Sequence, residues 1–176
     1  KLSTGLASTP MGGARIKIAT GNWVTARPVG IREGVDHLQT GEVRRIDAET
    51  IRDELNKDRV VLFSPVGYSP TGEIFNLRYE DVAMATATAL GADKLIFVLP
   101  TDPDTWKLAD DTGDAGQLSL AEAEALLASG THLSSDDRSH LTNAIGAGRG
   151  GVKRVHLVGA HTDGALLREL YTLDGA

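Results

Sequence analysis

The sequence predicts an α/β fold in which a mainly parallel β-sheet is sandwiched by helices. Residues 60–63 form a short, continuous apolar run, and residues 94–99 and 155–158 are mostly apolar; such segments are typical of strands that are covered on both faces. Segments with helical periodicity alternate with these runs along the chain. This alternation of strand and helix favours parallel strand pairing with helices on both faces of the sheet, an αβα sandwich.

The first part of the chain predicts shorter elements beside that sheet. Residues 14–18 alternate between apolar and polar, residues 21–22 signal a turn, and residues 23–26 predict the return strand of a hairpin. Residues 41–46 predict one more short strand. We therefore expect an N-terminal β-hairpin region, residues 14–45, at one edge of the sheet or projecting from it.

Capping signals predict where the helices begin and end. Asp47 is a good N-cap for a helix over residues 48–56. A helix of small residues is expected from Tyr79 to Leu90, with its stop at Gly91. Further helices are expected over residues 119–127, after a Ser119/Glu122 capping box, over residues 135–147, and after a cap at Asp163. Residues 67–73 predict a loop or a tight hairpin.

The composition of the chain limits the kinds of site and partner that it can have. The 176 residues suit one domain or a piece of a larger one, and the chain opens at Lys1 without a methionine, as a trimmed protein would. The absence of cysteine excludes disulfides and thiolate metal sites and fits a reducing cytoplasm. The net charge is -6, and no apolar run approaches the ~20 residues that span a bilayer. We expect neither a nucleic-acid partner nor a membrane.

Three motif-like features favour simple structural interpretations. Residues 146–151 fit G-x-G-x-x-G, but they follow a helix and precede a strand, so a helix stop and a turn are expected instead of a phosphate loop. The aspartates of residues 102–114 lack EF-hand spacing, so a solvated acidic loop is expected. The five histidines form no H-x-x-x-H pair, and no metal site is expected.

The C-terminal segment carries the strongest functional signal. A buried strand ends near His156 and Leu157, a helix then carries Glu169, and a Thr-Leu-Asp-Gly loop closes at Gly175. Strand carbonyls, a carboxylate and loop N–H groups can together bind a zwitterion that has a cationic tail, such as L-arginine. On the residues alone, a solvated Glu169 and a core His156 remain the alternative.

The pattern H-L-(x)n-G-A-L-L-x-E-L-(Y/F)-T-x-D-G resembles the end of the amino-acid-kinase-like domain of N-acetylglutamate synthases, a regulatory module that senses arginine. The resemblance extends over residues 60–98 and, more loosely, residues 14–47. It implies that the backbone of His156 and Leu157 and the carboxylate of Glu169 hold the arginine side chain. The amides around Gly175 would hold the α-carboxylate of arginine.

The resemblance also implies what the whole protein does. Such a synthase acetylates L-glutamate with acetyl-CoA in the first step of arginine biosynthesis, and its acetyltransferase domain would follow Ala176. Residues 1–176 would then form a single, partial amino-acid-kinase-like domain with no catalytic residue and no cofactor of its own. L-Arginine would be its effector, and the protein would be a cytoplasmic homo-oligomer, a hexamer in this family.

The main alternative is an acetylglutamate kinase, which transfers phosphate from ATP to N-acetylglutamate. Gly67 and Asn76 occupy the stretch that holds the substrate in these related kinases, but Arg78 and Glu80 depart from the kinase N-x-N-A-D pattern. The kinases also place a lysine on the helix that corresponds to residues 135–147, which contain none. We therefore expect a vestigial kinase-like site. The other alternative is an α/β interaction domain that binds no ligand.

Overall fold

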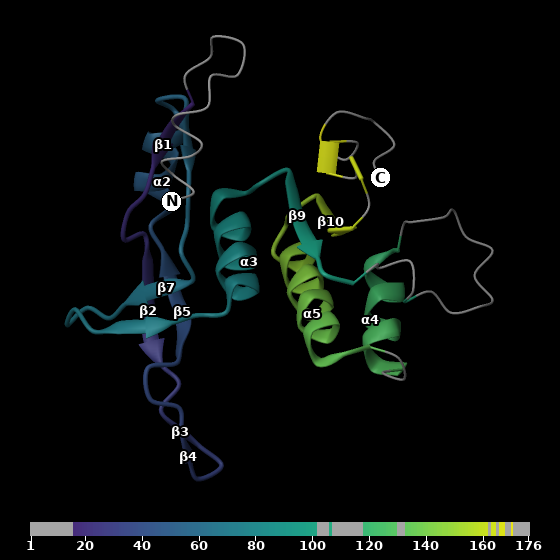
Figure 1. Cartoon of the computed structure of the whole chain (residues 1–176), viewed down its shortest axis with the longest axis horizontal. Helices are drawn as coiled ribbons and strands as arrows, with labels where there is room; N and C mark the ends of the chain where they lie inside the picture. Colours follow the sequence, from purple (N-terminus) through teal and green to yellow (C-terminus); the bar gives the residue numbers. More distant parts are fainter. Residues whose placement is uncertain are drawn as a thin grey trace. The chain divides into compact units, whose positions relative to one another are not determined.

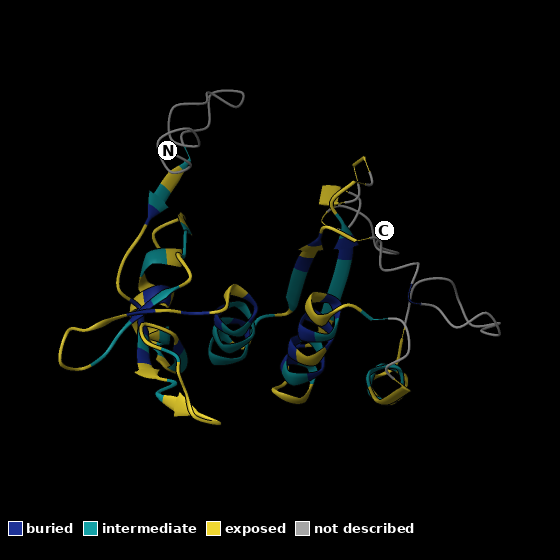
Figure 2. Cartoon of the chain, turned by 60° about the horizontal axis from the view of Figure 1, so that its bottom comes forward, coloured by how far each residue is buried: buried dark blue, intermediate teal, exposed yellow. Residues whose placement is uncertain are grey.

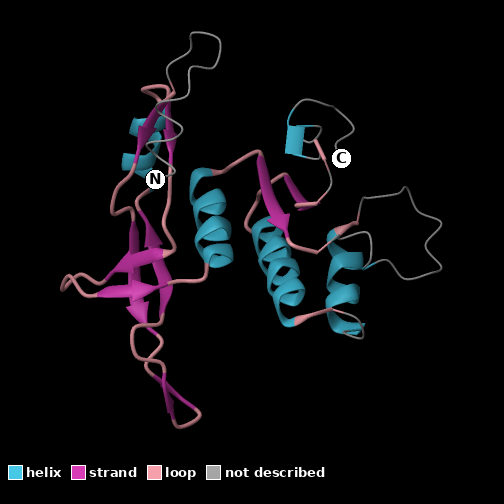
Figure 3. Ribbon diagram, viewed as in Figure 1, coloured by secondary structure: helices cyan, strands magenta, loops and turns pink. Residues whose placement is uncertain are grey.

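The chain forms two compact units, Lys1–Leu90 and Gly91–Ala176, each with its own strands and helices (Figure 1). A computed structural model describes residues 16–101, 106, 118–129, 133–161, 163–164, 166–167 and 170. Over these residues the fold is α/β, with four helices and several small sheets (Figure 3).

A four-stranded mixed sheet, in the order β5–β2–β7–β8, forms the centre of the first unit. Its strands are β2 (Val24–Pro28), β5 (Gly41–Ile46), β7 (Val66–Tyr68) and β8 (Ile74–Asn76). β2 pairs with β5 in antiparallel and with β7 in parallel orientation, and β7 pairs with β8 in antiparallel orientation. The tight hairpin foreseen as one possibility for residues 67–73 therefore forms, and the strand expected at residues 41–46 is confirmed.

The hairpin predicted from residues 14–18 and 23–26 is wrong. β1 (Lys17–Ala19) pairs in parallel with β6 (Arg59–Val61), in the register Ile18↔Val60. The turn signal at residues 21–22 marks a change of direction, but turn chemistry does not say which strand becomes the partner. Trp23 turns into a core with Ala19 and Ile51 instead, and its ring meets that of Phe63 edge-on at 5.4 Å.

A two-stranded arm interrupts the connection from β2 to β5. β3 (Ile31–Arg32) and β4 (Val35–Asp36) pair in antiparallel orientation and project from the four-stranded sheet (Figure 3). At the base of the arm, the carboxylate of Glu42 forms ion pairs with Arg27 and Arg32. β5 lies at the sheet edge, so the expectation of an edge or projecting region between residues 14 and 45 holds for β3–β5.

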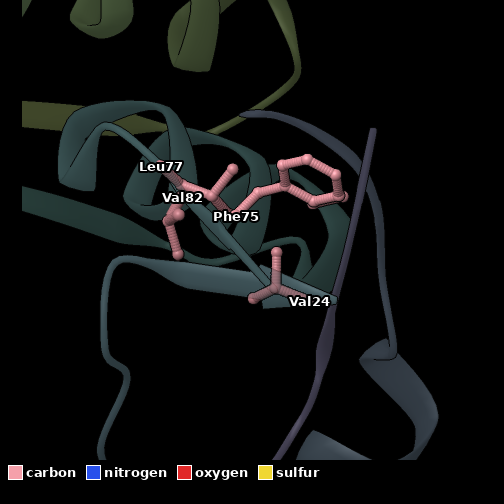
Figure 4. Packing of buried hydrophobic residues seen from close by; sticks show 5 residues of the cluster. Val24, Phe75, Leu77 and Val82 are labelled. Carbon is pink, nitrogen blue, oxygen red and sulfur yellow. The ribbon is translucent and has the colours of Figure 1, made fainter. Parts of the chain in front are cut away.

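Two helices complete the first unit. α2 (Ala48–Leu55) begins after Asp47, whose Oδ1 accepts a hydrogen bond from the Thr50 N–H at 3.2 Å, as the N-cap prediction requires. α3 (Tyr79–Leu90) has the predicted bounds and is followed by Gly91 at φ 64°, a conformation that favours glycine. The main core gathers Val24, Ala26, Phe75, Leu77 and Val82, from the sheet and the start of α3 (Figure 4).

The second unit is built around one parallel strand pair. β9 (Lys94–Leu99) and β10 (Arg154–Gly159) run in register from Arg154↔Lys94 to Gly159↔Leu99, and their bounds lie close to those predicted. α5 (Ser135–Arg149) packs on these strands, and α4 (Leu120–Ser129) packs on α5. The buried residues of this unit lie mostly on α5 and the two strands (Figure 2).

Capping predictions in the second unit are confirmed. The Ser119 N–H donates to Glu122 Oε2 at 2.6 Å, and the Glu122 N–H donates to Ser119 Oγ at 3.2 Å. Gly150 caps the C-terminus of α5, so residues 146–151 are a helix end and a turn, as expected. The acidic stretch 102–114, except Trp106, lies outside the described residues.

Two features of the predicted sheet need correction. Parallel and antiparallel pairings are mixed, because the short connections within residues 24–76 form antiparallel hairpins. The strands are also not covered on both faces within the described structure, since Val60 and Val98 are each 48% exposed. A continuous apolar run identified the strands correctly but did not establish that both of their faces are covered.

Candidate ligand-binding site

Two of the four predicted arginine-binding residues lie on β10, and the other two cannot be placed. His156 and Leu157 pair with Ile96 and Phe97 of β9. Glu169 and Gly175 lie outside the described residues.

The backbone hydrogen bonds of β10 distinguish His156 from Leu157, because the two residues face different edges of the strand. The Arg154 N–H donates to the Asp93 carbonyl at 3.2 Å, and the Ala160 N–H donates to the Leu99 carbonyl at 2.7 Å. Because successive residues of a strand direct their backbone polar groups to alternate edges, the even-numbered residues bond to β9. The N–H and carbonyl of Leu157 therefore face the other edge of β10, which pairs with no strand among the described residues.

The side chains of β10 divide between two faces. Phe97 meets His140 of α5 edge-on at 5.8 Å, so its face of the strand pair is the one that α5 covers. Leu157 is the register partner of Phe97 and shares that face. Side chains alternate along a strand, so His156 and Val158 lie on the opposite face.

A hollow opens on this opposite face at the carboxyl ends of the two strands. Its volume is about 480 Å³, within the usual range for small-molecule sites. Its lining combines the ends of the strands with the segment that follows them: Val98, Val158, Gly159, Ala160, His161, Asp163, Gly164, Leu166 and Leu167. Ligands of open α/β sheets characteristically bind outside the carboxyl ends of parallel strands.

The described lining of the hollow includes one acidic residue, Asp163, and one histidine, His161. Val98 and Val158 are among its apolar lining residues. The sequence assigned Asp163 only a capping role and did not single out the two valines. Val158 could have been predicted from its spacing, because it lies two residues after His156 and therefore on the same face of the strand. The register that brings Val98 beside Val158 is not visible in the sequence.

Comparison with known proteins places this fold in a family. The sequence model of the amino acid kinase family matches residues 2–157 of this chain. The chain belongs to the amino acid kinase family. A shared fold does not by itself determine function, so the more similar proteins are the informative ones.

The similar curated proteins are longer than this chain, and those compared below are amino-acid acetyltransferases. The chain is 49% identical over 174 residues to the amino-acid acetyltransferase of Ralstonia nicotianae. This match covers 98% of this chain and 38% of the relative. It is 48% identical over 177 residues to the amino-acid acetyltransferase of Ectopseudomonas mendocina, covering 99% of this chain and 39% of the relative. The chain thus spans about two fifths of the length of the curated relatives that it matches.

A solved structure supports the same relationship. N-Acetylglutamate synthase from Neisseria gonorrhoeae, complexed with coenzyme A and L-arginine, is 33% identical to this chain and superposes with a TM-score of 0.82. The match covers 98% of this chain and 40% of the synthase chain.

Gly67 and Asn76, expected from the sequence to be a vestigial kinase-like site, both take part in the packing of the first unit. A Cβ on Gly67 would lie 2.7 Å from the Ala26 Cβ and 2.8 Å from Leu77 Cδ1, so only glycine lets β7 approach so closely. The Asn76 N–H donates to the Gln39 carbonyl at 2.7 Å and so joins β8 to the chain before β5. Neither role requires a bound substrate.

Arg78 and Glu80, the two residues that depart from the kinase pattern, lie close together. Arg78 Nη2 lies 3.7 Å from the carboxylate oxygen Oε1 of Glu80 at the start of α3, and Glu80 is buried. A buried carboxylate is costly unless a cation and hydrogen bonds compensate it. Arg78, at 3.7 Å, therefore offsets part of the cost of burying the Glu80 carboxylate.

α5 carries buried polar groups but no lysine. Burial of Asp137 would raise the pKa of its carboxyl, but hydrogen bonds from Thr101 at 2.5 Å and Ser134 at 2.7 Å, with His140 nearby, outweigh burial and lower that pKa. His140 is also buried, with Nδ1 2.7 Å from the Asp136 carbonyl oxygen. α5 thus carries a buried carboxylate and no lysine, consistent with the expectation drawn from the sequence.

The described residues contain neither a metal-binding cluster nor a membrane-spanning helix. No group of three or more histidine, cysteine, aspartate or glutamate side chains is placed to hold a metal ion there. No helix in that part of the chain has the length and apolar character to cross a membrane.

Proposed function

We propose that this chain is the arginine-sensing regulatory domain of an N-acetylglutamate synthase. The observation that carries the proposal is the hollow at the end of β10, which the strand ends and residues 160–167 line in the described part of the chain. The similarity to a synthase that was crystallised with L-arginine supports it over 98% of the chain.

In the proposed complex, the guanidinium of arginine is held between β10 and the helix that follows it. The Leu157 carbonyl, on the edge of β10 that pairs with no described strand, accepts a hydrogen bond from it, and His156 lies on the same face of β10 as Val158, which lines the hollow. The Glu169 carboxylate neutralises its charge, and N–H groups near Gly175 bind the α-carboxylate. Asp163 adds a second carboxylate to the wall.

The whole protein would acetylate L-glutamate with acetyl-CoA, in a cytoplasmic enzyme that is a homo-oligomer of hexamer type. We propose that its acetyltransferase domain follows Ala176 and that residues 1–176 supply no catalytic residue. The two units would belong to one partial amino-acid-kinase-like domain, and the complete domain would be an αβα sandwich. Arginine would regulate the enzyme by favouring one quaternary arrangement over another.

Titration calorimetry with a Glu169→Ala variant tests the assigned site. Loss of one charge-assisted hydrogen bond costs about 1.5–3 kcal/mol, so arginine affinity should fall roughly 10- to 150-fold. Glu124→Ala is the matched control, because Glu124 lies on α4 and pairs with Arg149 away from the hollow. Unchanged arginine affinity in the Glu169 variant would refute the assignment.

L-Citrulline provides a second test of the same site. Its urea group has nearly the shape of the guanidinium but no charge, so it loses the attraction to the carboxylates of the site. We expect citrulline to bind at least about tenfold more weakly than arginine, since charged hydrogen bonds are stronger than neutral ones. Equal binding of the two ligands would show that the site does not recognise a cation.

A further inference from the structure

The turn after β10 contains the dipeptide Asp163-Gly164, whose chemistry has not yet been used. The sequence has two Asp-Gly pairs and no Asn-Gly pair, and Asp163-Gly164 is the pair that lies within the described residues. In an Asp-Gly pair, the glycine nitrogen can attack the carboxyl carbon of the aspartate side chain, because a five-membered ring closes easily and glycine has no Cβ to obstruct the approach. Exposure and freedom of the aspartate decide whether a given pair reacts.

The described structure leaves this pair open to solvent. Asp163 and Gly164 are both exposed and lie in a turn. Gly164 has φ 69°, a left-handed conformation that favours glycine, and a Cβ added there would meet nothing within 4 Å. Neighbouring groups therefore leave room for a ring to close between the two residues.

The Asp163 carboxylate is also free to move. It forms no hydrogen bond or ion pair within the described part of the chain. Asp93, by contrast, pairs with Lys153 at 2.7 Å. The Asp47 carboxylate accepts hydrogen bonds from the N–H and the hydroxyl of Thr50. No such contact holds the Asp163 carboxyl carbon away from the Gly164 nitrogen.

We propose that Asp163-Gly164 is a site of spontaneous aspartate isomerisation in the wall of the hollow. The Gly164 nitrogen bonds to Cγ of the protonated Asp163 carboxyl, and a carboxyl oxygen leaves as water together with the amide proton. Water then adds to one carbonyl of the resulting succinimide. Opening at the main-chain carbonyl gives isoaspartate, and opening at the side-chain carbonyl restores aspartate. The water lost is regained, so neither an oxidant nor a further reactant is needed.

Isomerisation would change the wall of the hollow, because Asp163 is one of its lining residues. The backbone then runs through the former side chain and gains a methylene group, and the carboxylate moves onto the Cα. We expect arginine to bind the isomerised chain roughly two- to fivefold more weakly, the worth of one exposed charge pair. This consequence rests on the proposed function, whereas the chemistry at Asp163 does not.

Peptide mapping by mass spectrometry of the complete 176-residue chain tests the chemistry. During incubation at mildly acidic pH, isoaspartate should accumulate at residue 163 at least about tenfold faster than at Asp53, an exposed aspartate within α2 that precedes Glu54. Asp163→Asn gives a second readout, because the same ring then forms with release of ammonia and the mass of the peptide changes. Isoaspartate at residue 163 that is no more abundant than at Asp53 overturns the proposal.

The β3–β4 turn supplies a matched control. Glu33 precedes Gly34, which has φ 80° and equally open surroundings, but a glutamate would have to close a six-membered ring, which forms more slowly. Asp163→Glu should therefore abolish the modification at residue 163, and Glu33→Asp should introduce it at residue 33. Modification at residue 163 that persists in the Asp163→Glu chain contradicts the proposed ring closure.

Calorimetry with L-arginine on the separated aspartate and isoaspartate forms tests the consequence for the hollow. The aspartate form should bind arginine more tightly, and arginine should slow the isomerisation by engaging the carboxylate. Equal affinity of the two forms would overturn the link between Asp163 and the ligand. Absence of arginine binding in both forms would instead contradict the proposed function, while the isomerisation measured by peptide mapping would stand.

Discussion

Replacing Gly67 by alanine tests whether the kinase-like remnant is a packing element. The added Cβ would lie 2.7 Å from the Ala26 Cβ, 2.8 Å from Leu77 Cδ1 and 3.3 Å from the Val24 carbonyl oxygen. The Leu77 methyl can rotate away, but Ala26 sits on β2 and is 1% exposed, so relief there requires the strands to separate. Overpacking of this kind costs about 1–3 kcal/mol of unfolding free energy.

The compensating change is Ala26→Gly, which removes the nearest obstacle. Alone, it should also destabilise the protein, because a buried methyl is lost and glycine is more flexible in the unfolded chain. Combined with Gly67→Ala, it should recover roughly 1 kcal/mol relative to the sum of the two single changes. That favourable coupling is the signature of a steric contact between the two positions.

Urea unfolding provides the assay. Trp23 lies in the core of the first unit, so its fluorescence in a Trp106→Phe background reports that unit. If Gly67→Ala unfolds at the wild-type urea concentration, or if the double variant shows no coupling, the packing explanation is refuted.

Two further predictions concern buried side chains. Ile51→Ala should lower the unfolding free energy by about 2–5 kcal/mol, because Ile51 is completely buried; a urea midpoint within error of the wild type would contradict its place in the core. Asp137 has a lowered pKa in the folded chain. Its contribution to the free energy of unfolding is therefore present above the unfolded pKa of about 3.9 and is lost as the pH falls toward the pKa of the folded chain. Asp137→Asn should therefore be about 1.5–3 kcal/mol less stable at pH 7, and the difference should shrink below pH 4 in unfolding curves of both proteins; a pH-independent difference would exclude the charge as its cause.

Local signals in the sequence predicted individual elements well. α3 has its predicted bounds because its start and its Gly91 stop are set by neighbouring residues, and Ser119 and Glu122 form both bonds of the predicted capping box. Asp47 caps α2 for the same reason. Such features depend on three or four adjacent residues, which a sequence displays directly.

Strand pairing was harder to predict because it depends on residues far apart in the sequence. β1 pairs with β6, about forty residues later, and a turn signal beside β1 wrongly suggested a neighbouring partner. Likewise, the sequence located His156 and Leu157 at a strand end, but only the register with β9 shows that Leu157 faces the unpaired edge. The predictions for Glu169 and Gly175 stay predictions.

The most direct test of the arginine site is an NMR titration of the ¹⁵N-labelled chain with L-arginine. The account predicts saturable shifts of the Leu157 and Gly159 amides, at the unpaired edge of β10 and the hollow, while the Gly67 and Asn76 amides stay in place. ATP at the same concentration should leave all four unchanged. Shifts at Gly67 and Asn76 with ATP, and none at Leu157 with arginine, would contradict an arginine sensor and favour a nucleotide-binding kinase.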